Sequence, residues 1–418
     1  MPSRRARSAR TLRRSVALST AAVTAVGLLG ACSIIEGDGS SPSQEPGSSD
    51  RAGARAEGTV AKPQSAVRLD LNLPARAQAP VPVDTLLAVS AESGSLDKVS
   101  FTTGRGAAVP GEMNKKGTAW TASERLEPGT TYRVEAKGED ADGLPKTLSR
   151  TFRTADLTLD DQTYASIAPL DGETVGVGMP VIVTFDVPVT DRAEIERHLD
   201  VQSSPVQQGS WYWMSDTEVH WRPKTYWKPG TEVTVDADVN GVNAGNGIFG
   251  QEDREASFTV GDSLFMNIDV QAHTMKVVEN GRLLRTIPIS AGKPGFTTRS
   301  GVKVIIEKFE SKRMDAATTG ISESDPEYYN LSNVQYAQRV TYSGEFIHAA
   351  PWSVGSQGSE NVSHGCVGMS TENAGWLYSL TQRGDVVDVT GTDRPMELSN
   401  GFGDWNLSWA DYQEGSAL

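Results

Sequence analysis

Residues 347–370 read IHAAPWSVGSQGSENVSHGCVGMS, and this segment concentrates the reactive side chains of the chain. It holds His348 and His364, two of the five histidines, and Cys366, one of the two cysteines. Residues 345–348 predict a short strand, and the Gly-, Ser- and Asn-rich residues after it predict a loop. A thiol with the ordinary pKa of ~8.5 is only slightly ionised near neutrality, so a nucleophilic cysteine needs a neighbouring imidazole. We therefore expect a nucleophile in a loop and a base from a strand.

The same segment carries a family signature. Ser-His-Gly-Cys ends at Cys366, and a His-Ala-Ala-Pro-Trp-Ser run begins 18 residues upstream of it, at His348. Together they resemble the active-site signature of the L,D-transpeptidases, whose catalytic domain is of the YkuD type. The resemblance covers about residues 263–390 and also includes Gly292-Lys293-Pro294, residues 297–301, Met314-Asp315, Tyr342-Ser343-Gly344 and Gly375-Trp376.

The resemblance implies a role for each of these residues. Cys366 would be the nucleophile and His348 the general base and then acid, oriented by a backbone carbonyl near Ala349. The backbone amides of Gly365 and Cys366 are candidate oxyanion donors. The implied substrate-binding residues are Ser343, Gly344, Tyr329, Met314, Ser363, His364, Gly365 and Gly368, with Ser363 and His364 shaping the loop. Two positions depart from the family's pattern, since Thr319 stands where relatives often carry Tyr and Gly368 where they commonly carry Asn.

The substrate class also comes from the resemblance. It implies attack after the L-centre of diaminopimelate in a peptidoglycan tetrapeptide stem, release of D-alanine, and transfer to the side-chain amine of a second stem, which makes a 3→3 cross-link. Carbapenem β-lactams are the expected inhibitors. An L,D-carboxypeptidase with the same thioester and a non-enzymatic wall-binding lipoprotein remain open as alternatives. Zinc held by Cys366, His364 and His348 would lack a fourth ligand at a usual spacing, so we expect no metal and no cofactor.

Residues 1–31 are expected to be a lipoprotein signal peptide. Six arginines precede an apolar run at residues 16–29, and Leu29-Gly30-Ala31-Cys32 places small residues and a cysteine at the cleavage site. This arrangement resembles a bacterial lipoprotein signal, which implies a lipid on Cys32 and an extracytoplasmic protein anchored to the cell membrane and facing the wall. An uncleaved membrane anchor is the alternative, but about 14 apolar residues fall short of the ~20 needed to span a bilayer. Residues 32–59 are rich in Gly, Ser, Pro and charge and predict a flexible tether.

Composition is consistent with a folded, exported protein of several domains. The chain has 418 residues, of which 38% are hydrophobic, with 41 Gly and 21 Pro, which favours β-rich and turn-rich modules. Its formal net charge of −14 becomes −20 without the arginine-rich signal. No basic stripe is present to neutralise phosphates, so a nucleic-acid partner is disfavoured.

Two sets of short alternating runs predict two β-sandwiches, at residues 60–155 and 156–261. They are related by a repeat, because Trp120 precedes Pro128-Gly129 and Trp221 precedes Pro229-Gly230 with the same offset of 101 residues. This pair resembles the immunoglobulin-like domains found ahead of the catalytic domain in multi-domain L,D-transpeptidases. His198 and His220 are expected to be structural. In Trp211-Tyr212-Trp213 we expect at least one ring in the core.

Residues 262–391 are the expected catalytic domain. It should open as a β-meander with a hairpin turn at Asn280-Gly281, and Ser370 should cap a helix at residues 371–381. Residues 310–333 lose periodicity and predict a lid over the substrate. The aromatic-rich C-terminal extension, residues 392–418, should pack back on the catalytic domain or the second sandwich. The expected fold class is mainly β, with two immunoglobulin-like β-sandwich domains followed by a β-rich L,D-transpeptidase catalytic domain with one main helix.

Overall fold

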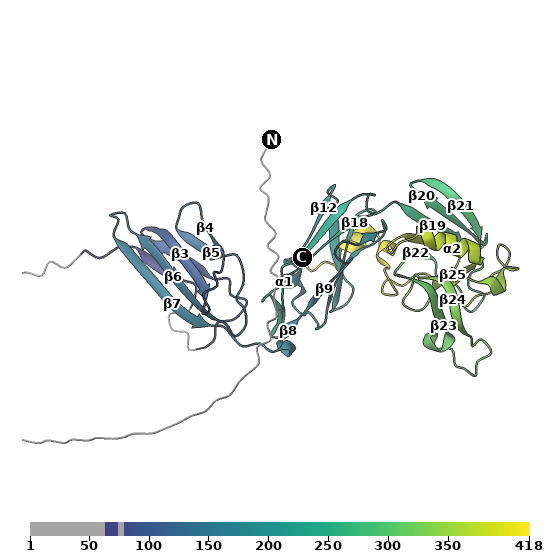
Figure 1. Cartoon of the computed structure of the whole chain (residues 1–418), viewed down its shortest axis with the longest axis horizontal. Helices are drawn as coiled ribbons and strands as arrows, with labels where there is room; N and C mark the ends of the chain where they lie inside the picture. Colours follow the sequence, from purple (N-terminus) through teal and green to yellow (C-terminus); the bar gives the residue numbers. More distant parts are fainter. Residues whose placement is uncertain (1–62, 74–78) are drawn as a thin grey trace, which may run out of the picture. The chain divides into compact units, whose positions relative to one another are not determined.

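The computed structural model describes residues 63–73 and 79–418 (Figure 1). The expected signal peptide, the tether and Cys32 lie outside the described residues. Strands dominate this part of the chain, and its three α-helices are α1 (Arg192–Glu196), α2 (Thr371–Leu380) and α3 (Trp409–Gln413). None of the helices in the described ranges is long and apolar enough to cross a membrane. The mainly β class with one main helix, α2, is confirmed.

The first group of strands forms a two-layered sandwich. One sheet has the order β1 (Arg68–Leu71), β2 (Ala88–Glu92), β5 (Ala119–Ala122), β4 (Gly111–Met113), and the other has the order β3 (Ser95–Thr103), β6 (Thr131–Glu139), β7 (Pro145–Arg153). Their inner faces share one core built around Phe101, Trp120 and Tyr132. Side chains alternate inward and outward along β6, as in a strand with one buried face.

A second sandwich follows after the 3₁₀ turn η1 (Leu159–Asp161). One sheet has the order β13 (Gly209–Trp213), β14 (Glu218–Pro223), β11 (Val181–Phe185), β9 (Ala165–Ala168). The other has the order β10 (Thr174–Val175), β18 (Arg254–Val260), β15 (Glu232–Ala237), β12 (Leu199–Ser204). A third, small sheet consists of β16 (Asn243–Gly245), β17 (Ile248–Gly250) and β8 (Gln162–Thr163). Trp211, Trp213 and Trp221 lie in its core, so the core position expected for the aromatic run is confirmed.

The predicted repeat corresponds to equivalent turns in the two sandwiches. Gly129 and Gly230 both have positive φ, +56° and +75°, which glycine adopts without steric cost. Each lies in the turn that leads into a central strand, β6 or β15. Trp120 and Trp221 are both buried.

The catalytic part begins with a five-stranded sheet. Its order is β21 (Arg282–Pro288), β20 (Thr274–Glu279), β19 (Leu264–Asp269), β27 (Val386–Thr390), β22 (Gly301–Val304). The first three strands in sequence form the predicted meander, and the turn residues Asn280 and Gly281 both have positive φ, as a type I′ hairpin requires. Strand β27 returns parallel to β19, which joins the two ends of the catalytic part in one sheet.

A second catalytic sheet carries the residues of the family signature. Its order is β23 (Glu307–Asp315), β24 (Asn330–Arg339), β25 (Phe346–Ala349), β26 (Val367–Met369). Helix α2 packs on β24 and β25, and its cap is the predicted one, because Ser370 Oγ accepts a hydrogen bond from the Asn373 amide at 3.2 Å. Both catalytic sheets contribute to one core that includes Met266, Ile347 and Leu377.

Residues 310–333, the expected lid, form the outer part of a long hairpin; their role as a lid stays a prediction. Strands β23 and β24 pair antiparallel over most of their length, and only residues 316–329 at the tip, including η2 (Ala316–Thr319), lie outside strands. Side chains on both faces of β23 remain partly exposed. Because neither face is fully buried, the sequence has no apolar alternation and conceals the strands.

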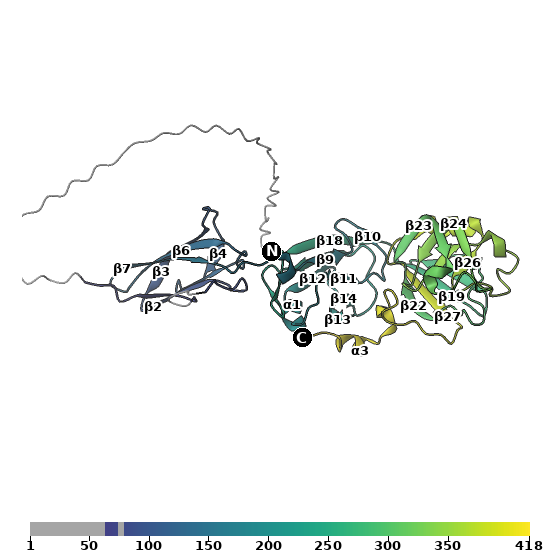
Figure 2. The same ribbon diagram turned by 90° about the horizontal axis from the view of Figure 1, so that it is seen from below.

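The C-terminal extension packs on both the second sandwich and the catalytic part, as predicted. We call residues 396–418, with η4 (Asp404–Asn406) and α3, the C-terminal strap. Tyr412 is fully buried and stacks on Tyr212 of β13, with ring centroids 5.2 Å apart; Figure 2 shows α3 beside β13. The Asn406 amide nitrogen donates to the Val302 carbonyl of β22 at 2.7 Å. The strap therefore joins two parts of the fold that are distant in sequence.

Candidate active site

Two parallel strands position the signature residues. β25 and β26 pair in parallel, with His348 opposite Gly368, and Cys366 immediately precedes β26. Parallel neighbours need a crossover connection, which here is the loop after Ala350 with its short turn η3 (Pro351–Ser353). The 18 residues between His348 and Cys366 thus bring the thiol next to the strand that carries the imidazole.

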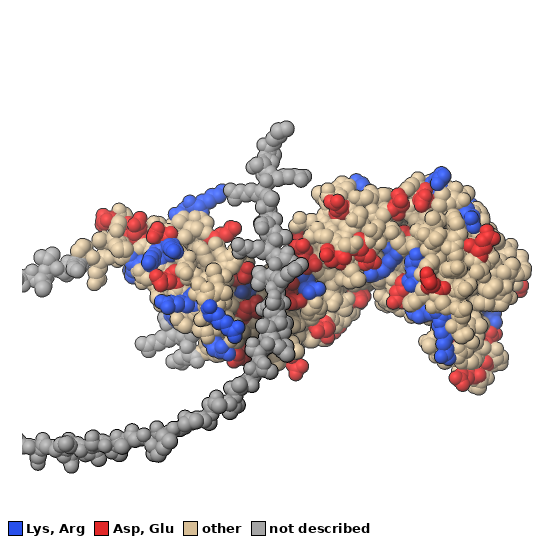
Figure 3. Space-filling model, in the orientation of Figure 1, with Lys and Arg blue, Asp and Glu red and all other residues tan. Residues whose placement is uncertain are grey.

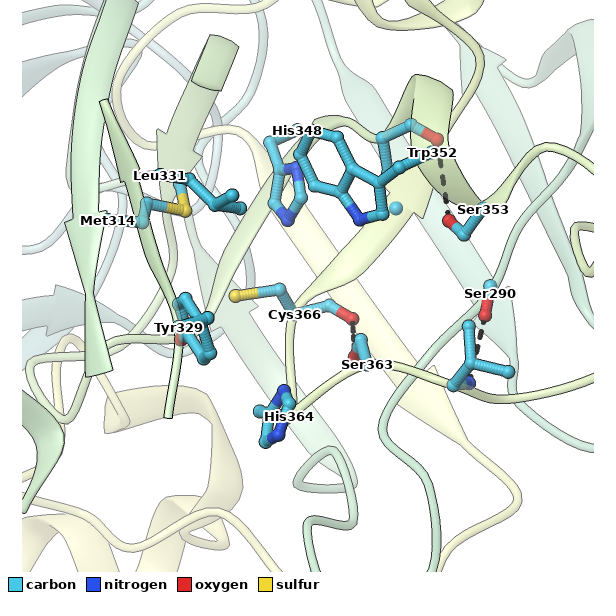
Figure 4. A pocket seen from close by; sticks show the side chains of 13 residues that line it. Ser290, Met314, Tyr329, Leu331, His348, Trp352, Ser353, Ser363, His364 and Cys366 are labelled. Carbon is cyan, nitrogen blue, oxygen red and sulfur yellow. Dashed lines mark hydrogen bonds between the residues drawn. The ribbon is translucent and has the colours of Figure 1, made fainter. Parts of the chain in front are cut away.

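Both side chains enter one pocket of about 330 Å³. Figure 4 shows the Cys366 sulfur projecting between the rings of His348 and Tyr329, with Met314 and Leu331 on one wall. Trp352 stacks near His348, with ring centroids 5.9 Å apart, and is 57% exposed. A largely apolar pocket with a few polar groups converging on one thiol is the usual form of a small-molecule site.

The tautomer of His348 follows from its hydrogen bond. Nδ1 lies 2.8 Å from the backbone carbonyl of Ala349, which can only accept, so Nδ1 carries the proton. The neutral ring therefore keeps an unprotonated Nε2 that can take a proton from a nucleophile. The orienting carbonyl of Ala349 is the one expected from the sequence.

Burial keeps both reactive groups neutral at rest. It lowers the pKa of His348 below its ordinary value of 6.5, against the opposing effect of the bond to Ala349. It also raises the pKa of the Cys366 thiol to about 12. Desolvation disfavours the charged form of each group, so the free site favours a thiol and a neutral imidazole over a thiolate–imidazolium pair.

Ser363 holds the nucleophile loop, as expected. Its hydroxyl donates to the Cys366 carbonyl at 2.6 Å and accepts from the Gly365 amide at 3.1 Å. The Gly365 amide, the other candidate oxyanion donor, donates to the Ser363 oxygen in this structure, and its part in catalysis stays a prediction. In the described part of the chain the Cys366 amide has no hydrogen-bond acceptor, which leaves it available to a developing oxyanion.

A second cavity, of about 280 Å³, lies along the hairpin. Ser343 and Gly344 line it, and Met314 and Tyr329 line both cavities. The Cys366 thiol, which lines the first cavity, donates at 3.6 Å to the carbonyl of Gly344, a residue that lines the second. Burial raises the pKa of Tyr329 to about 12, which keeps its hydroxyl protonated.

A buried cluster of charged side chains packs against the nucleophile loop at Gly365. The Glu345 carboxylate accepts from Lys303 at 2.5 Å and from Arg299 at 3.1 Å. Gly365 has a φ of +123° and lies next to Glu345. A Cβ added to Gly365 would lie 3.6 Å from the Cγ of Glu345. Glu345 raises and Lys303 lowers the pKa of the thiol. Their effects on the thiol oppose each other, so the cluster fixes the loop and does not create a thiolate.

His364 connects the nucleophile loop to the hairpin tip. Its Nε2 lies 2.7 Å from Glu327 Oε2, which also accepts from Lys293 at 2.5 Å. The His364 ring contacts Phe296 and Tyr329, with centroids 4.6 Å and 5.0 Å away. Glu327 could not be singled out from the sequence, because it lies in a polar segment with several other acids.

The two departures from the family's pattern have definite surroundings. A Cβ added to Gly368 would lie 2.8 Å from the Ala350 Cβ, so a side chain there requires a shift of η3. Thr319 lines the second cavity and lies close to Gly344. A Cβ added to Gly344 would lie 3.1 Å from the methyl group of Thr319. Trp352 is a pocket residue that the sequence analysis did not select, although it belongs to the quoted signature.

No three His, Cys, Asp or Glu side chains in the described ranges gather in a way that could hold a metal ion. His348 and His364 both line the cysteine pocket, but their rings bind Ala349 and Glu327 respectively.

Two family models match the chain. Residues 78–243 match the bacterial Ig domain and residues 265–389 match the L,D-transpeptidase catalytic domain, YkuD. The second match contains the whole cysteine pocket.

Several relatives match over most of their length. L,D-transpeptidase 2 of Mycobacterium tuberculosis is 35% identical over 338 residues, which are 81% of this chain and 82% of the relative. L,D-transpeptidase 5 of the same organism is 33% identical over 365 residues, which are 85% of this chain and 78% of the relative. Among solved structures, the L,D-transpeptidase LdtMt1 in complex with imipenem is 39% identical, with a TM-score of 0.48, over 54% of this chain and 98% of that chain. With Cys366 and His348 in one pocket inside the matched catalytic domain, this chain belongs to the L,D-transpeptidase family.

Proposed function

We propose that this enzyme forms 3→3 cross-links between diaminopimelate residues of peptidoglycan stems through a thioester on Cys366. The thiol sulfur attacks the carbonyl after the L-centre of diaminopimelate, and His348 Nε2 accepts the thiol proton. The imidazolium then returns this proton to the nitrogen of the departing D-alanine, and the C–N bond breaks. The side-chain amine of a second stem attacks the thioester, loses a proton to His348 and releases the thiol.

The observation that carries this proposal is the pairing of a thiol with an oriented, unprotonated imidazole nitrogen in one pocket. The Cys366 amide supports it as an oxyanion donor. Gly344, Tyr329 and Met314, together with Ser363 and His364 on the loop, are the proposed substrate contacts. Gly368 contributes space beside Ala350 and no side-chain donor.

Transfer to an amine is favoured over hydrolysis by the two cavities. They share Met314 and Tyr329, and the thiol, which lines the first cavity, donates to the carbonyl of Gly344 in the wall of the second. An acyl donor and an acceptor stem need separate spaces on the two sides of one sulfur, whereas a carboxypeptidase needs room only for water.

Product analysis tests the proposal. Purified full-length protein incubated with tetrapeptide stems should release D-alanine and yield 3→3 dimers, identified by tandem mass spectrometry. Cys366→Ala should yield neither while it keeps the wild-type unfolding transition. Release of D-alanine with only tripeptide as product would instead establish an L,D-carboxypeptidase, and turnover by Cys366→Ala within tenfold of wild type would overturn the nucleophile.

We further propose that Cys32 carries a lipid, so that the enzyme faces the wall from the outer side of the cell membrane. The sequence Leu29-Gly30-Ala31-Cys32 after an apolar run supports this. Residues 60–155 and 156–261, the proposed sandwich domains, would then set the distance between membrane and active site. Cys32→Ala should release active enzyme from the membrane fraction, and continued attachment would contradict a lipid anchor.

A further inference from the structure

The turn Tyr342-Ser343-Gly344 lies between β24 and β25 and lines the second cavity. The carbonyl of Gly344 is the acceptor for the Cys366 thiol, so the shape of this turn bears on where the thiol points. Within the turn, the Gly344 amide donates to the Thr341 carbonyl at 3.4 Å, and the Thr341 and Ser343 hydroxyl oxygens are 3.3 Å apart. Both distances are long for hydrogen bonds. The turn therefore depends on support from elsewhere in the molecule.

Asn400 of the C-terminal strap supplies this support. Figure 3 shows the face of the molecule on which the β23–β24 hairpin projects, with basic side chains over the hairpin and acidic ones at its lower tip. The side-chain oxygen of Asn400 accepts from the Ser343 amide at 2.8 Å, and its side-chain nitrogen donates to the Ser343 hydroxyl oxygen at 2.9 Å. The orientation of the Asn400 amide is fixed, because the Ser343 backbone N–H can only donate. Two short bonds from one side chain thus hold both the backbone and the side chain of Ser343.

A chain of hydrogen bonds also connects Asn400 to the nucleophile loop. The Asn400 side-chain nitrogen donates to Glu397 Oε2 at 3.1 Å, and the same oxygen accepts from Arg299 Nε at 2.6 Å. The Arg299 guanidinium donates to Glu345 at 3.1 Å, and Glu345 lies next to Gly365. The strap therefore reaches the surroundings of the thiol by two routes, through the turn and through Glu345.

The strap residues that follow Asn400 are closely packed. Gly401 has a φ of +117°, and a Cβ added to it would lie 3.0 Å from Ile306 Cδ1. Phe402 is buried, and its ring meets the Tyr342 ring edge-on, with centroids 6.3 Å apart. A side chain that projects from such a packed backbone has a defined position, so Asn400 can hold the turn in one place.

We propose that Asn400 is a positioning residue for acylation, which fixes the Ser343-Gly344 turn and, through the Gly344 carbonyl, orients the Cys366 thiol. The inference rests on the proposed function, in which this thiol is the nucleophile. None of residues 396–418, all of which the structure describes, lines either cavity, so Asn400 acts through the turn. A misplacement of about 1 Å at a reacting group can cost ~10²-fold in rate, so loss of the two bonds should slow the attack by the sulfur.

The test is the single-turnover rate of D-alanine release by full-length protein at saturating tetrapeptide stem. Asn400→Ala should slow this step about tenfold, because it removes both side-chain bonds to Ser343. Asn400→Asp keeps an acceptor for the Ser343 amide and can accept from the Ser343 hydroxyl, so its rate should lie within about twofold of wild type.

Asn406→Ala is the matched control. Asn406 lies on the same strap, and its side chain also makes two bonds to one residue of the catalytic part, accepting from the Val302 amide at 2.8 Å and donating to the Val302 carbonyl at 2.7 Å. Neither bond involves the turn. Both alanine variants should lower the unfolding midpoint to a similar extent, and only Asn400→Ala should slow the release of D-alanine.

Equal rates in Asn400→Ala and wild type, equal slowing by the two alanine variants, or an Asn400→Asp variant as slow as Asn400→Ala would each overturn the inference. If wild type releases no D-alanine, the proposed function fails, and acylation of Cys366 by imipenem, followed by intact mass, decides the inference without a stem. An adduct that forms about tenfold more slowly in Asn400→Ala than in Asn406→Ala supports the role of Asn400. Equal rates in these two variants overturn it.

Discussion

Cys366 and His348 each favour their neutral form, because burial opposes the thiolate and the imidazolium alike. The neighbouring charges do not alter this, since Glu345 and Lys303 act on the thiol with opposite signs. We therefore expect the thiolate–imidazolium pair to form during acylation and not in the free site. Proton transfer to His348 Nε2 becomes part of the acylation step.

The first prediction is a pH profile that follows from the lowered pKa of His348. D-Alanine release should lose kcat/KM only at acidic pH, with a midpoint below 6.5, because the neutral imidazole persists above its lowered pKa. Rates measured from pH 5 to pH 9 test this. A rate that keeps rising through pH 8 would show that a preformed thiolate is needed.

The variant His348→Gln should acylate about 10²–10⁴-fold more slowly than wild type, a loss typical of a missing general base.

The reactive residues could be predicted from the sequence because they belong to one short, chemically unusual segment. Cys366, His348 and Ser363 all lie within 19 residues of each other. Glu327 could not be predicted, because its importance depends on which partners the fold provides. A glutamate that binds Lys293 and His364 looks like any other acid in a polar sequence.

The β23–β24 hairpin is the element that forms one wall of both cavities near the thiol, through Met314 and Tyr329. Its strands line the second cavity, and its tip bears Glu327, which binds Lys293 and His364. These contacts hold the tip on the nucleophile loop. The sequence pattern could not predict the hairpin, because strands exposed on both faces show no period of two. It did predict β19, β20 and α2, whose apolar faces are buried.

Glu327→Gln should loosen this tip. The variant removes the charge that Lys293 and His364 share, so hydrogen exchange of residues 316–329 should accelerate, and KM for the stem should rise several-fold with little change in the unfolding midpoint. Exchange mass spectrometry and steady-state kinetics measure the two effects. Glu323→Gln on the same tip is the control, because Glu323 makes no ion pair in the described structure. Unchanged exchange in Glu327→Gln would contradict the role of the tip contacts.

Thr319→Tyr should prolong the life of a carbapenem adduct. A β-lactam is a strained amide, and we expect a carbapenem to acylate Cys366 in place of the stem. Thr319 lies over Gly344, whose carbonyl contacts the thiol. An aromatic ring there would exclude water from the thioester. Intact-mass measurements over time should show a severalfold longer-lived adduct than in wild type, and Ser322→Tyr at the tip should not. An adduct on a residue other than Cys366 would overturn the site itself.

On the scale of the whole molecule, the C-terminal strap links the second sandwich to the catalytic sheets. His220 of β14 lies 2.9 Å from Asp404 of the strap, and both are fully buried. Tyr412 donates to the same carboxylate at 3.0 Å, and Arg222 lies over the Tyr412 ring at 4.2 Å. The sequence predicted that the aromatic tail would fold back. It could not predict the ion pair, because its partners are 184 residues apart.

The last prediction is that this link weakens at alkaline pH. Burial disfavours a charged His220, but Asp404 and Glu218 outweigh it and raise its pKa to about 9, above the ordinary 6.5. A raised pKa means that the stabilisation is complete below pH 6.5 and is lost as pH rises from 6.5 to 9, by up to about 3 kcal/mol. Urea unfolding at pH 6 and pH 9, followed by tryptophan fluorescence with Trp405 and Trp409 in the strap, measures it. His220→Gln should be destabilised at pH 6 and lose less stability than wild type on going to pH 9. His198→Gln is the matched control, because burial lowers the pKa of His198, and a histidine with a lowered pKa causes no loss of stability as the pH rises. If wild type and His220→Gln lose equal stability between pH 6 and pH 9, His220 is not charged in the folded protein and the strap is held by packing alone.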